Sequence, residues 1–364
     1  MRRLTVTAVL LALLAVVFPA IAADTRADLR SDDSLATPLV VVAAGDIACK
    51  PGRSTTPTAC RDDDTARLLA GGDLVLGLGD QQYYAGTLSE FNSVYADSWG
   101  KYKLVTRPAL GNHEYYSAGA SGYFDYFGSL RAGQRDRGYY TYIRNGWRFI
   151  AINSNCGKVS CSIGSAQYKW LKSVLGTNYD CQVAYMHHPR WSVGNYSGYS
   201  ATSDLVKLLD DYNVELLLTS HDHNYQRWVP QSHLGKPQSG GIVQFVVGTG
   251  GGSLYEFERN SSRVAAKTDK NFGVLRLTLD EGGWASQFVP VDGSYTDRSQ
   301  GVCRPYEGRA IPCGPRVGWC YRLGLQRRAR VDRLRRRDRH RRGDVGVPCH
   351  DHLHPLQQLH PFDG

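Results

Sequence analysis

Residues 74–84, LVLGLGDQQYY, begin as an apolar run and end in a glycine turn that carries two polar side chains. Apolar runs of about four to eight residues bounded by glycine are typical of a buried β-strand. Asp80 follows this run directly, and Tyr83 comes three residues later. The pattern predicts a core strand that presents a carboxylate and a phenol together at its carboxyl end.

Similar apolar runs recur along the chain and alternate with helical patterns. The hydrophobic content of 42% suffices for a large core and excludes a mainly disordered protein. Strands separated by helices indicate an α/β fold, and the last strands, which follow one another without a helix, indicate an antiparallel part. We expect helices at residues 62–72, 165–176 and 203–213, and strands at residues 39–46, 74–80, 103–112, 148–154, 182–188, 214–221, 242–251, 273–281 and 284–293.

Polar residues of metal-ligand type follow five of these strands. Open α/β sheets bind ligands at the carboxyl ends of their strands, so these side chains are expected to converge on one crevice. A single histidine is more often a core or surface residue than a ligand, but five such motifs in sequence order argue against that interpretation. The candidate ligands are Asp46, Asp80, Tyr83, Asn112, His187, His221 and His223. This set is too large for one tetrahedral zinc and suits two octahedral metals bridged by Asp80.

Two other catalytic motifs are excluded. The sequence contains no G-x-S-x-G nucleophile motif. The glycine run GTGGGS at residues 248–253 lacks the lysine of a phosphate-binding P-loop. We interpret this run as a tight loop at a strand end, near the predicted site.

Five short motifs, in this order, resemble the blocks of the calcineurin-like metallophosphoesterases: GDIA, GDQQY, GNHE, MHHP and SHDH, at residues 45–48, 79–83, 111–114, 186–189 and 220–223. GDQQY also resembles the G-D-x-x-Y block of purple acid phosphatases. The resemblance covers residues 39–297. It implies an α/β fold built as a four-layer α/β/β/α sandwich with mixed sheets, and a metal site at the carboxyl ends of strands.

The resemblance also implies which metal each residue would bind. The first metal would be held by Asp46, Asp80, Tyr83 and His223, and the second by Asp80, Asn112, His187 and His221. Ala48 stands where many relatives have a ligand histidine, and Tyr83 supplies the missing donor. Because a phenolate is a hard anionic donor, the expected pair is Fe(III) with Zn, Mn or Fe(II). Ser220 replaces the usual glycine before His221, and since serine resists some backbone conformations open to glycine, we expect weaker binding of the second metal.

By the same resemblance the protein would be an acid phosphatase-like hydrolase of small phosphate monoesters. A metal-bound hydroxide would attack phosphorus, His113 would protonate the departing alkoxide, and Glu114 would orient His113. His188 and Tyr115 are further candidates for substrate contact. The alternatives are a phosphodiesterase or nucleotide hydrolase of the same fold, and a catalytically silent binding module. The complete ligand set argues against the silent module.

An aromatic cluster follows these motifs and has two interpretations. It either packs the loops together or forms a stacking wall for an aromatic or nucleotide leaving group. The sequence leaves both open. The members of the cluster are Tyr84, Tyr115, Tyr116, Tyr123, Phe124 and Tyr126.

The N-terminus is expected to direct export from the cell. Arg2 and Arg3 precede an apolar run of about 16 residues, shorter than the roughly 20 that a membrane-spanning helix needs. Ala20-Ile21-Ala22 fits a cleavage site, so residues 1–22 are a predicted signal peptide. An uncleaved membrane anchor is the alternative. We expect a secreted protein, extracellular or periplasmic, without membrane contact after cleavage.

Export permits disulfides between the nine cysteines, whose spacing does not resemble a zinc site. We expect Cys49 to pair with Cys60, and Cys156 with Cys161 or Cys181. The odd total leaves at least one cysteine without an intramolecular partner.

Residues 23–300 are the expected catalytic domain, and residues 301–364 an Arg- and His-rich tail that we expect to be disordered. Residues 315–364 contain twelve Arg and five Asp, so most of the net charge of +9 lies in this tail. The basic balance therefore requires no nucleic-acid partner for the domain. The tail is either a basic arm or, as we prefer, an out-of-frame translation of a GC-rich gene. The sequence does not indicate an oligomeric state.

Overall fold

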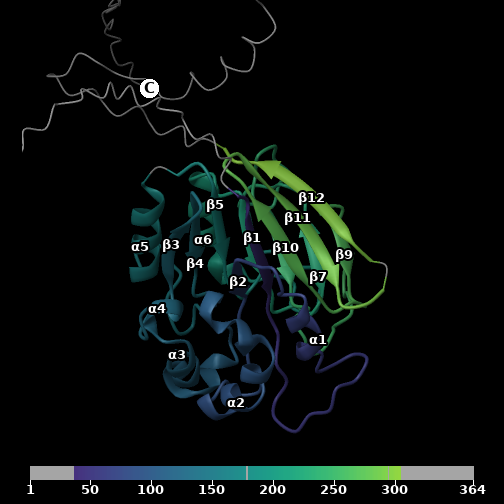
Figure 1. Ribbon diagram of the computed structural model, residues 1–364. Coiled ribbons are helices and arrows are strands. Elements are labelled where there is room, and N and C mark those ends of the chain that lie inside the picture. The colour runs from purple at the N-terminus through teal and green to yellow at the C-terminus, as the bar shows by residue number, and fades with distance from the viewer. Residues whose placement is uncertain (1–36, 178, 294, 305–364) are drawn as a thin grey trace, which may run out of the picture.

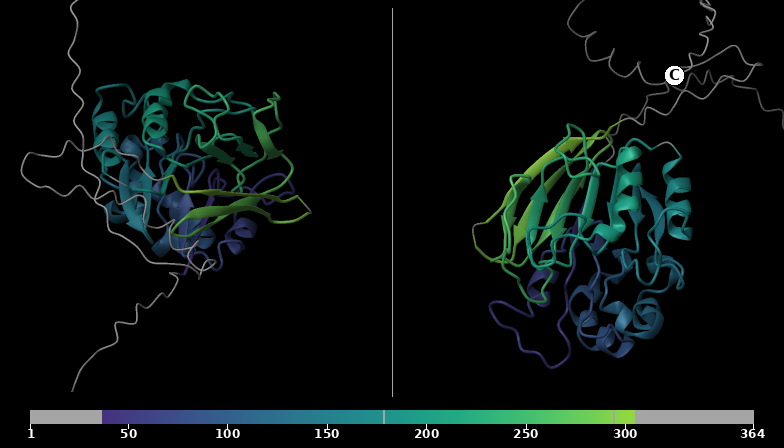
Figure 2. Two further views of the ribbon diagram at one scale, coloured as in Figure 1. Left: turned by 90° about the horizontal axis from the view of Figure 1, so that it is seen from above. Right: turned by 180° about the vertical axis from the view of Figure 1, so that it is seen from behind.

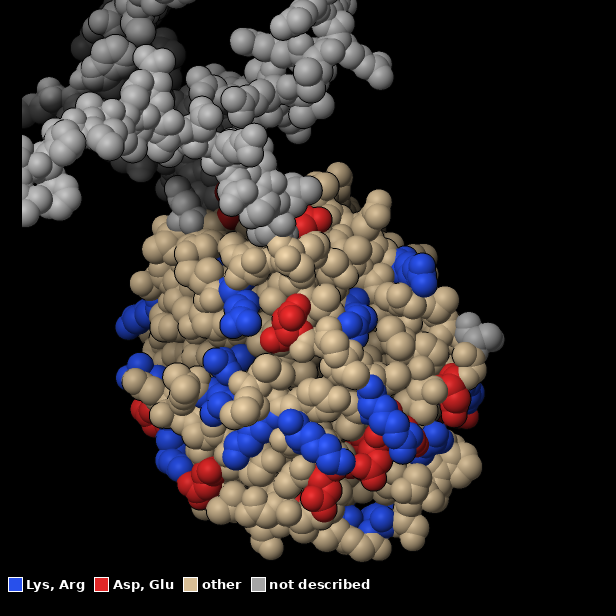
Figure 3. All heavy atoms as spheres, in the orientation of Figure 1, with Lys and Arg blue, Asp and Glu red and all other residues tan. Residues whose placement is uncertain are grey.

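The structure of this protein is a computed structural model, which describes residues 37–177, 179–293 and 295–304. The predicted signal peptide at residues 1–22 lies outside the described residues, and so does the tail beyond residue 304. Lys and Arg are interspersed with Asp and Glu on the face of the molecule in Figure 3.

Two β-sheets form the centre of the fold (Figure 1). The five-stranded sheet has the order β12-β11-β10-β1-β2 and consists of β1 (Leu39–Ala44), β2 (Leu74–Gly77), β10 (Gly273–Leu279), β11 (Gly283–Pro290) and β12 (Asp297–Val302). In it β1 and β2 are parallel, whereas β10, β11 and β12 pair antiparallel.

The seven-stranded sheet has the order β3-β4-β5-β6-β8-β7-β9. It consists of β3 (Tyr140–Arg144), β4 (Trp147–Ala151), β5 (Gln182–Tyr185), β6 (Leu216–Thr219), β7 (Tyr225–Trp228), β8 (Val243–Val247) and β9 (Val264–Thr268). The strands β4, β5, β6 and β8 run parallel, and β3, β7 and β9 are antiparallel to their neighbours. The expected α/β fold with two mixed sheets is confirmed.

The main hydrophobic core lies between the two sheets. Leu277 and Phe288 of one sheet and Tyr185 and Phe245 of the other are fully buried in one cluster. Each side chain of this size contributes about 1.5–3 kcal/mol when it is removed from water. The sheets therefore pack face to face as a sandwich.

Helices cover the outer face of the seven-stranded sheet. There α5 (Ala166–Leu175) and α6 (Ser203–Asp211) lie side by side (Figure 1, Figure 2). Leu171 and Leu209 of these helices pack against Leu217 of β6 in a second core. The Ser165 hydroxyl accepts a hydrogen bond from the backbone of Tyr168 and caps α5. The remaining helices are α1 (Asp62–Arg67), α2 (Leu88–Ser93), α3 (Ser121–Phe127), α4 (Ser129–Ala132) and the 3-10 turns η1 (Tyr95–Asp97), η2 (Trp99–Val105), η3 (Glu114–Tyr116), η4 (Ala118–Ala120) and η5 (Ser200–Thr202).

The predicted strand at residues 103–112 is wrong. This segment begins inside η2 and continues as irregular chain beside β2, where the Arg107 amide donates to the Val75 carbonyl and the Ala109 amide to the Gly77 carbonyl. Pro108 lies between these two residues and has no N–H, so it interrupts a regular ladder.

Three disulfides tie the described chain together. The expected Cys49–Cys60 bond is confirmed, and Cys156 pairs with Cys161. Cys181 pairs with Cys303 and joins the start of β5 to the end of β12. The expected domain boundary after residue 300 therefore falls inside a strand that belongs to the fold. None of the helices in the described part of the chain has the length and apolarity to cross a bilayer.

Candidate metal centre

Parallel strands bring the predicted ligands to one edge of the sandwich. Asp46 follows β1, Asp80 follows β2, and His221 follows β6. These three residues have left-handed backbone conformations, with φ of 58°, 47° and 69°. Such values are uncommon outside glycine, and they turn the chain sharply where each strand ends.

One half of the centre contains Asp46, Tyr83 and His223. The Tyr83 hydroxyl donates to Asp46 Oδ1 at 2.8 Å and lies 2.9 Å from His223 Nε2. The Nδ1 of His223 donates to the Ser253 carbonyl at 2.7 Å, and the Tyr255 ring stacks on the imidazole at 4.0 Å. The imidazole is therefore fixed with its Nε2 facing the carboxylate and the phenol.

The other half contains Asn112, His187 and His221. His187 Nε2 lies 3.0 Å from Asn112 Oδ1 and 3.1 Å from His221 Nδ1. His187 Nδ1 donates to the Leu78 carbonyl at 3.0 Å, which leaves Nε2 facing the centre. Hydrogen bonds of this kind commonly orient the imidazoles of metal sites.

Asp80 lies between the two halves. Its Oδ2 is 3.4 Å from His187 Nε2, and one ligand atom each of Asp46, Asp80 and His187 lie within 4.8 Å of one another. The structure thus brings all seven predicted donors together. Carboxylate, amide and phenol oxygens with imidazole nitrogens are a donor set that fits two metal ions with one bridging carboxylate.

Without cations, the buried charged groups of the centre pair with one another. Burial disfavours the charged forms, yet the charge of nearby His187 holds the pKa of Asp80 well below its usual range. Burial also lowers the pKa of His187, but the negative charges of Asp80, Asp46 and Glu114 together outweigh burial and raise that pKa to about 9. Burial, followed by Asp46 and Asp80, raises the pKa of Tyr83 well above its usual value, so the phenol keeps its proton unless a cation replaces it.

Ser220 fits its position without the expected backbone strain. The left-handed conformation falls on His221, not on Ser220. The Ser220 hydroxyl donates to the Leu78 carbonyl at 2.6 Å and lies 2.9 Å from His187 Nδ1. A side chain at Gly45 would come within 2.4 Å of this hydroxyl, so glycine at residue 45 makes room for serine at residue 220.

His113 lies beside the centre and is oriented by its backbone neighbours. Its Nδ1 donates to the Tyr84 carbonyl at 2.7 Å, and its amide donates to Asp80 Oδ1 at 2.9 Å. Its Nε2 is 3.9 Å from Asp80 Oδ2. The Nε2 atom is therefore the one that can exchange a proton with a group bound at the centre.

Glu114 has a different partner from the one expected. Its fully buried carboxylate accepts hydrogen bonds from the backbone amides of Asp80, Gln81 and Gly111, at 3.0, 2.7 and 2.7 Å. It therefore joins the turn after β2 to the loop that carries Asn112, and the structure gives it no hydrogen bond to the His113 ring. The local sequence GNHE contains no signal for this arrangement, because the partners are backbone groups.

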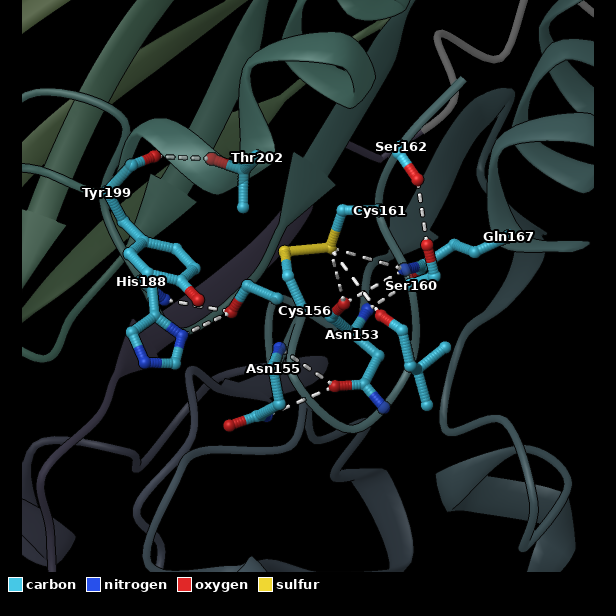
Figure 4. Close-up of a disulfide and its surroundings, with 12 residues drawn as sticks. Asn153, Asn155, Cys156, Ser160, Cys161, Ser162, Gln167, His188, Tyr199 and Thr202 are labelled. Carbon is cyan, nitrogen blue, oxygen red and sulfur yellow. Dashed lines mark hydrogen bonds between the residues drawn. A yellow bond between two sulfur atoms is a disulfide. The ribbon is translucent and has the colours of Figure 1, made fainter. Parts of the chain in front are cut away.

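His188 is buried, with 8% of its surface exposed. Its Nδ1 lies 2.9 Å from the Ser154 hydroxyl, and its ring lies 4.5 Å from that of His221. Figure 4 shows it beside Tyr199, near the Cys156–Cys161 disulfide. One ligand atom each of His187, His188 and His221 lie within 4.8 Å of one another, so this position suits a metal ligand as well as a substrate contact.

A cavity of about 680 Å³ opens above the centre. Tyr115 does not line it, because this tyrosine is directed away and its hydroxyl accepts from Asn153 Nδ2 at 2.7 Å. Its neighbour Tyr116 lines the cavity instead. The lining residues are Cys49, Lys50, Arg53, Tyr83, Tyr84, Asn112, His113, Tyr116, Tyr196, His221, His223, Gly252, Ser253 and Tyr255.

Sequence reasoning missed Tyr196, whose ring stacks on His221 at 4.2 Å. Asp222 fixes the segment that carries Tyr196, because its carboxylate accepts hydrogen bonds from the Tyr196 amide and from the Ser192 hydroxyl. The sequence offered one signal for this arrangement, the aspartate between the two histidines of SHDH.

Comparisons with known proteins agree with this geometry. The sequence model of the calcineurin-like phosphoesterase family matches residues 39–225. No curated protein matches the sequence. The purple acid phosphatase PPD1 from seeds of yellow lupin (Lupinus luteus) is similar in structure, with a TM-score of 0.63 and 21% identity over 74% of this chain and 54% of that chain. The expected resemblance to purple acid phosphatases is confirmed.

Two more distant structures share the fold. GAP50, the anchor in the inner membrane complex of Plasmodium, has a TM-score of 0.53 and 17% identity over 75% of this chain and 90% of that chain. A dimetal phosphatase from Danio rerio has a TM-score of 0.50 and 13% identity over 74% of this chain and 99% of that chain. The chain spans about half the length of the lupin protein, and at these identities the similarity concerns the fold.

Proposed function

This chain belongs to the calcineurin-like phosphoesterase family, and we propose that it is a secreted dinuclear-metal phosphatase that hydrolyses phosphate monoesters. The observation that carries the proposal is the convergence of seven donor side chains around Asp80, His187 and Asp46, next to His113. The G-D-x-x-Y motif at residues 79–83 supports an activity like that of purple acid phosphatases.

In this proposal Asp46, Tyr83 and His223 would hold one ion, Asn112, His187 and His221 would hold the other, and Asp80 would be shared between them. Two such ions would supply Lewis acidity and a water of lowered pKa. Displacing the Tyr83 proton leaves a phenolate, which favours Fe(III) in the first position, with Zn, Mn or Fe(II) in the second.

The phenolate has an optical test. An iron(III) phenolate absorbs visible light, so the oxidised protein should be pink to violet and the Tyr83→Phe variant should be colourless with its fold intact. A colourless, fully active protein that holds only zinc or manganese by elemental analysis would contradict the iron assignment.

The protein's own groups would position and protonate the substrate. His113, held through Nδ1 by the Tyr84 carbonyl, presents Nε2 toward the centre and would give its proton to the departing oxygen. Glu114 would keep Asp80 and Asn112 at a fixed separation through its three backbone hydrogen bonds.

Secretion is part of the proposal. The three disulfides support an oxidising compartment. N-terminal sequencing of the exported protein should find residue 23 first, and retention of residues 1–22 would contradict a cleaved signal.

The activity is tested with the metal-loaded protein and two chromogenic substrates, p-nitrophenyl phosphate and bis(p-nitrophenyl) phosphate. We expect a much larger kcat/KM for the monoester. Preference for the diester would favour the phosphodiesterase alternative. If neither substrate releases p-nitrophenol, only the alternative of a catalytically silent binding module is left.

A further inference from the structure

Two tyrosine rings at the mouth of the cavity are left uncovered by the fold. Tyr84 is 57% exposed and Tyr116 is 54% exposed. Other members of the same aromatic cluster, Tyr123 and Phe124, are buried in the core and account for the loop-packing interpretation. Tyr84 and Tyr116 line the cavity instead, so packing does not explain them.

The two rings contact each other and the imidazole assigned to proton transfer. The ring centres of Tyr84 and Tyr116 lie 4.8 and 4.6 Å from that of His113, and 5.3 Å from each other. The backbone carbonyl of Tyr84 also accepts from His113 Nδ1. This leaves His113 Nε2 as the atom that meets the departing oxygen of a substrate.

Geometry then places the rest of the leaving group. An oxygen that accepts a proton from His113 Nε2 must lie within about 3 Å of it. The atoms bonded to that oxygen extend outward, and the exposed Tyr84 and Tyr116 rings lie next to each other, both in contact with the imidazole. A planar ring on the leaving group can pack against these tyrosines, whereas a small aliphatic group would leave them in water.

We propose that the site prefers phosphate esters whose leaving group carries an aromatic ring, and that Tyr84 and Tyr116 bind this ring. The inference rests on the proposed function and names its substrate class. It assigns the two tyrosines a role in specificity, separate from metal binding and proton transfer.

The test compares two substrates with the same charged groups, tyrosine O-phosphate and serine O-phosphate. Phenols leave more readily than alcohols, so the ratio of the two kcat/KM values is compared between proteins, and the intrinsic reactivity cancels. In the double variant Tyr84→Ala, Tyr116→Ala we expect the ratio to fall about 5- to 20-fold, a range set by typical aromatic contacts. An unchanged ratio would overturn the proposal.

Two control variants separate the ring from other contributions. Tyr84→Phe with Tyr116→Phe removes both hydroxyls, including the Tyr116 hydroxyl that interacts with Asn112. Because both rings remain, the ratio should stay near the wild-type value. Lys50→Ala with Arg53→Ala removes positive charge from the same cavity and should lower kcat/KM for both esters alike. A ratio that falls as far in either control as in the alanine variant would contradict a ring-specific contact.

Binding of non-hydrolysable analogues decides the question without turnover. By calorimetry with the metal-loaded protein, phenylphosphonate should bind several-fold more tightly than methylphosphonate, and the alanine variant should lose this difference. Equal affinities in the wild type would overturn the inference. If neither ester is hydrolysed, the proposed function fails, while the phosphonates still test the tyrosine contact.

Discussion

The two ends of β5 and β6 place similar polar groups in opposite circumstances. At the carboxyl ends, His187 and His221 face each other across 3.1 Å, with Asp80 nearby. At the amino ends, Cys181 is bonded to Cys303, and the Glu215 carboxylate accepts from the backbone amides of Gln182 and Arg304 at 2.9 Å each. At one end the chain itself satisfies its polar groups, and at the other it gathers donors that an external cation can bind.

This difference separates structure from function within single strands. Groups at the amino ends hold the last described strand against the seven-stranded sheet, so their loss should reduce stability. Groups at the carboxyl ends concentrate buried charge, which is unfavourable in itself and becomes useful only with a bound partner. The following substitutions test this separation.

The largest effect is expected from Asp80→Asn. The substitution removes the charge shared by both halves of the centre while keeping the side chain's size. We expect kcat/KM to fall by at least about 10³-fold, with loss of one or both metals by elemental analysis. Glu215→Gln, at the opposite end, should retain both metals and activity, and the comparison fails if the two variants lose metal equally.

His113→Ala should lower kcat by about 10²- to 10⁴-fold, because a proton donor is lost. Two metals per chain should remain, since His113 is not among the proposed ligands. Elemental analysis of the purified variant checks this, and loss of metal would show that His113 helps to hold the ions.

Removal of the disulfide at the amino ends should affect stability and leave catalysis intact. Cys181 and Cys303 are 122 residues apart in sequence, so their bond closes a long loop. In the double variant Cys181→Ser, Cys303→Ser, the free energy of unfolding should fall by about 2–5 kcal/mol. Denaturant titration measures this free energy. A large fall in kcat at 25 °C would contradict the separation of stability at the amino ends from activity at the carboxyl ends.

A smaller effect concerns the pH dependence of stability. Burial raises the pKa of Glu215 to about 7, so the native state binds this proton more tightly than the unfolded chain does. This contribution is complete below the ordinary glutamate pKa and is lost as the pH rises through about 7. Between pH 5 and 7 the wild type should lose up to about 1 kcal/mol per pH unit relative to Glu215→Gln. Denaturant titrations at several pH values measure the free energy of unfolding of both proteins. If it changes with pH in the same way in both, the assigned role of Glu215 is disproved.

The sequence predicted the carboxyl ends well because their chemistry is local. A candidate ligand directly after an apolar run, as in Asp46 and Asp80, can be recognised from neighbouring letters alone. The amino ends have no such signature. Glu215 lies inside the run VELLLTSH and resembled an ordinary strand residue, and the Cys181–Cys303 pairing depends on the order of strands in the sheets.

Two finer errors have a geometric cause. Tyr115 and Tyr116 both belong to the 3-10 turn η3, and which ring faces the cavity depends on how that turn is oriented. Similarly, the partners of Glu114 are backbone amides brought together by folding. Short-range patterns contain no information about either.

The left-handed conformations of Asp46, Asp80 and His221 set stability and activity against each other. A non-glycine residue there carries about 1–2 kcal/mol of strain, and glycine would relieve it. Mutagenesis followed by selection for heat resistance alone should therefore enrich glycine at these turns and erase the donors that the turns present. In the proposed function, the chain therefore gives up stability for metal binding at three separate points of the same edge.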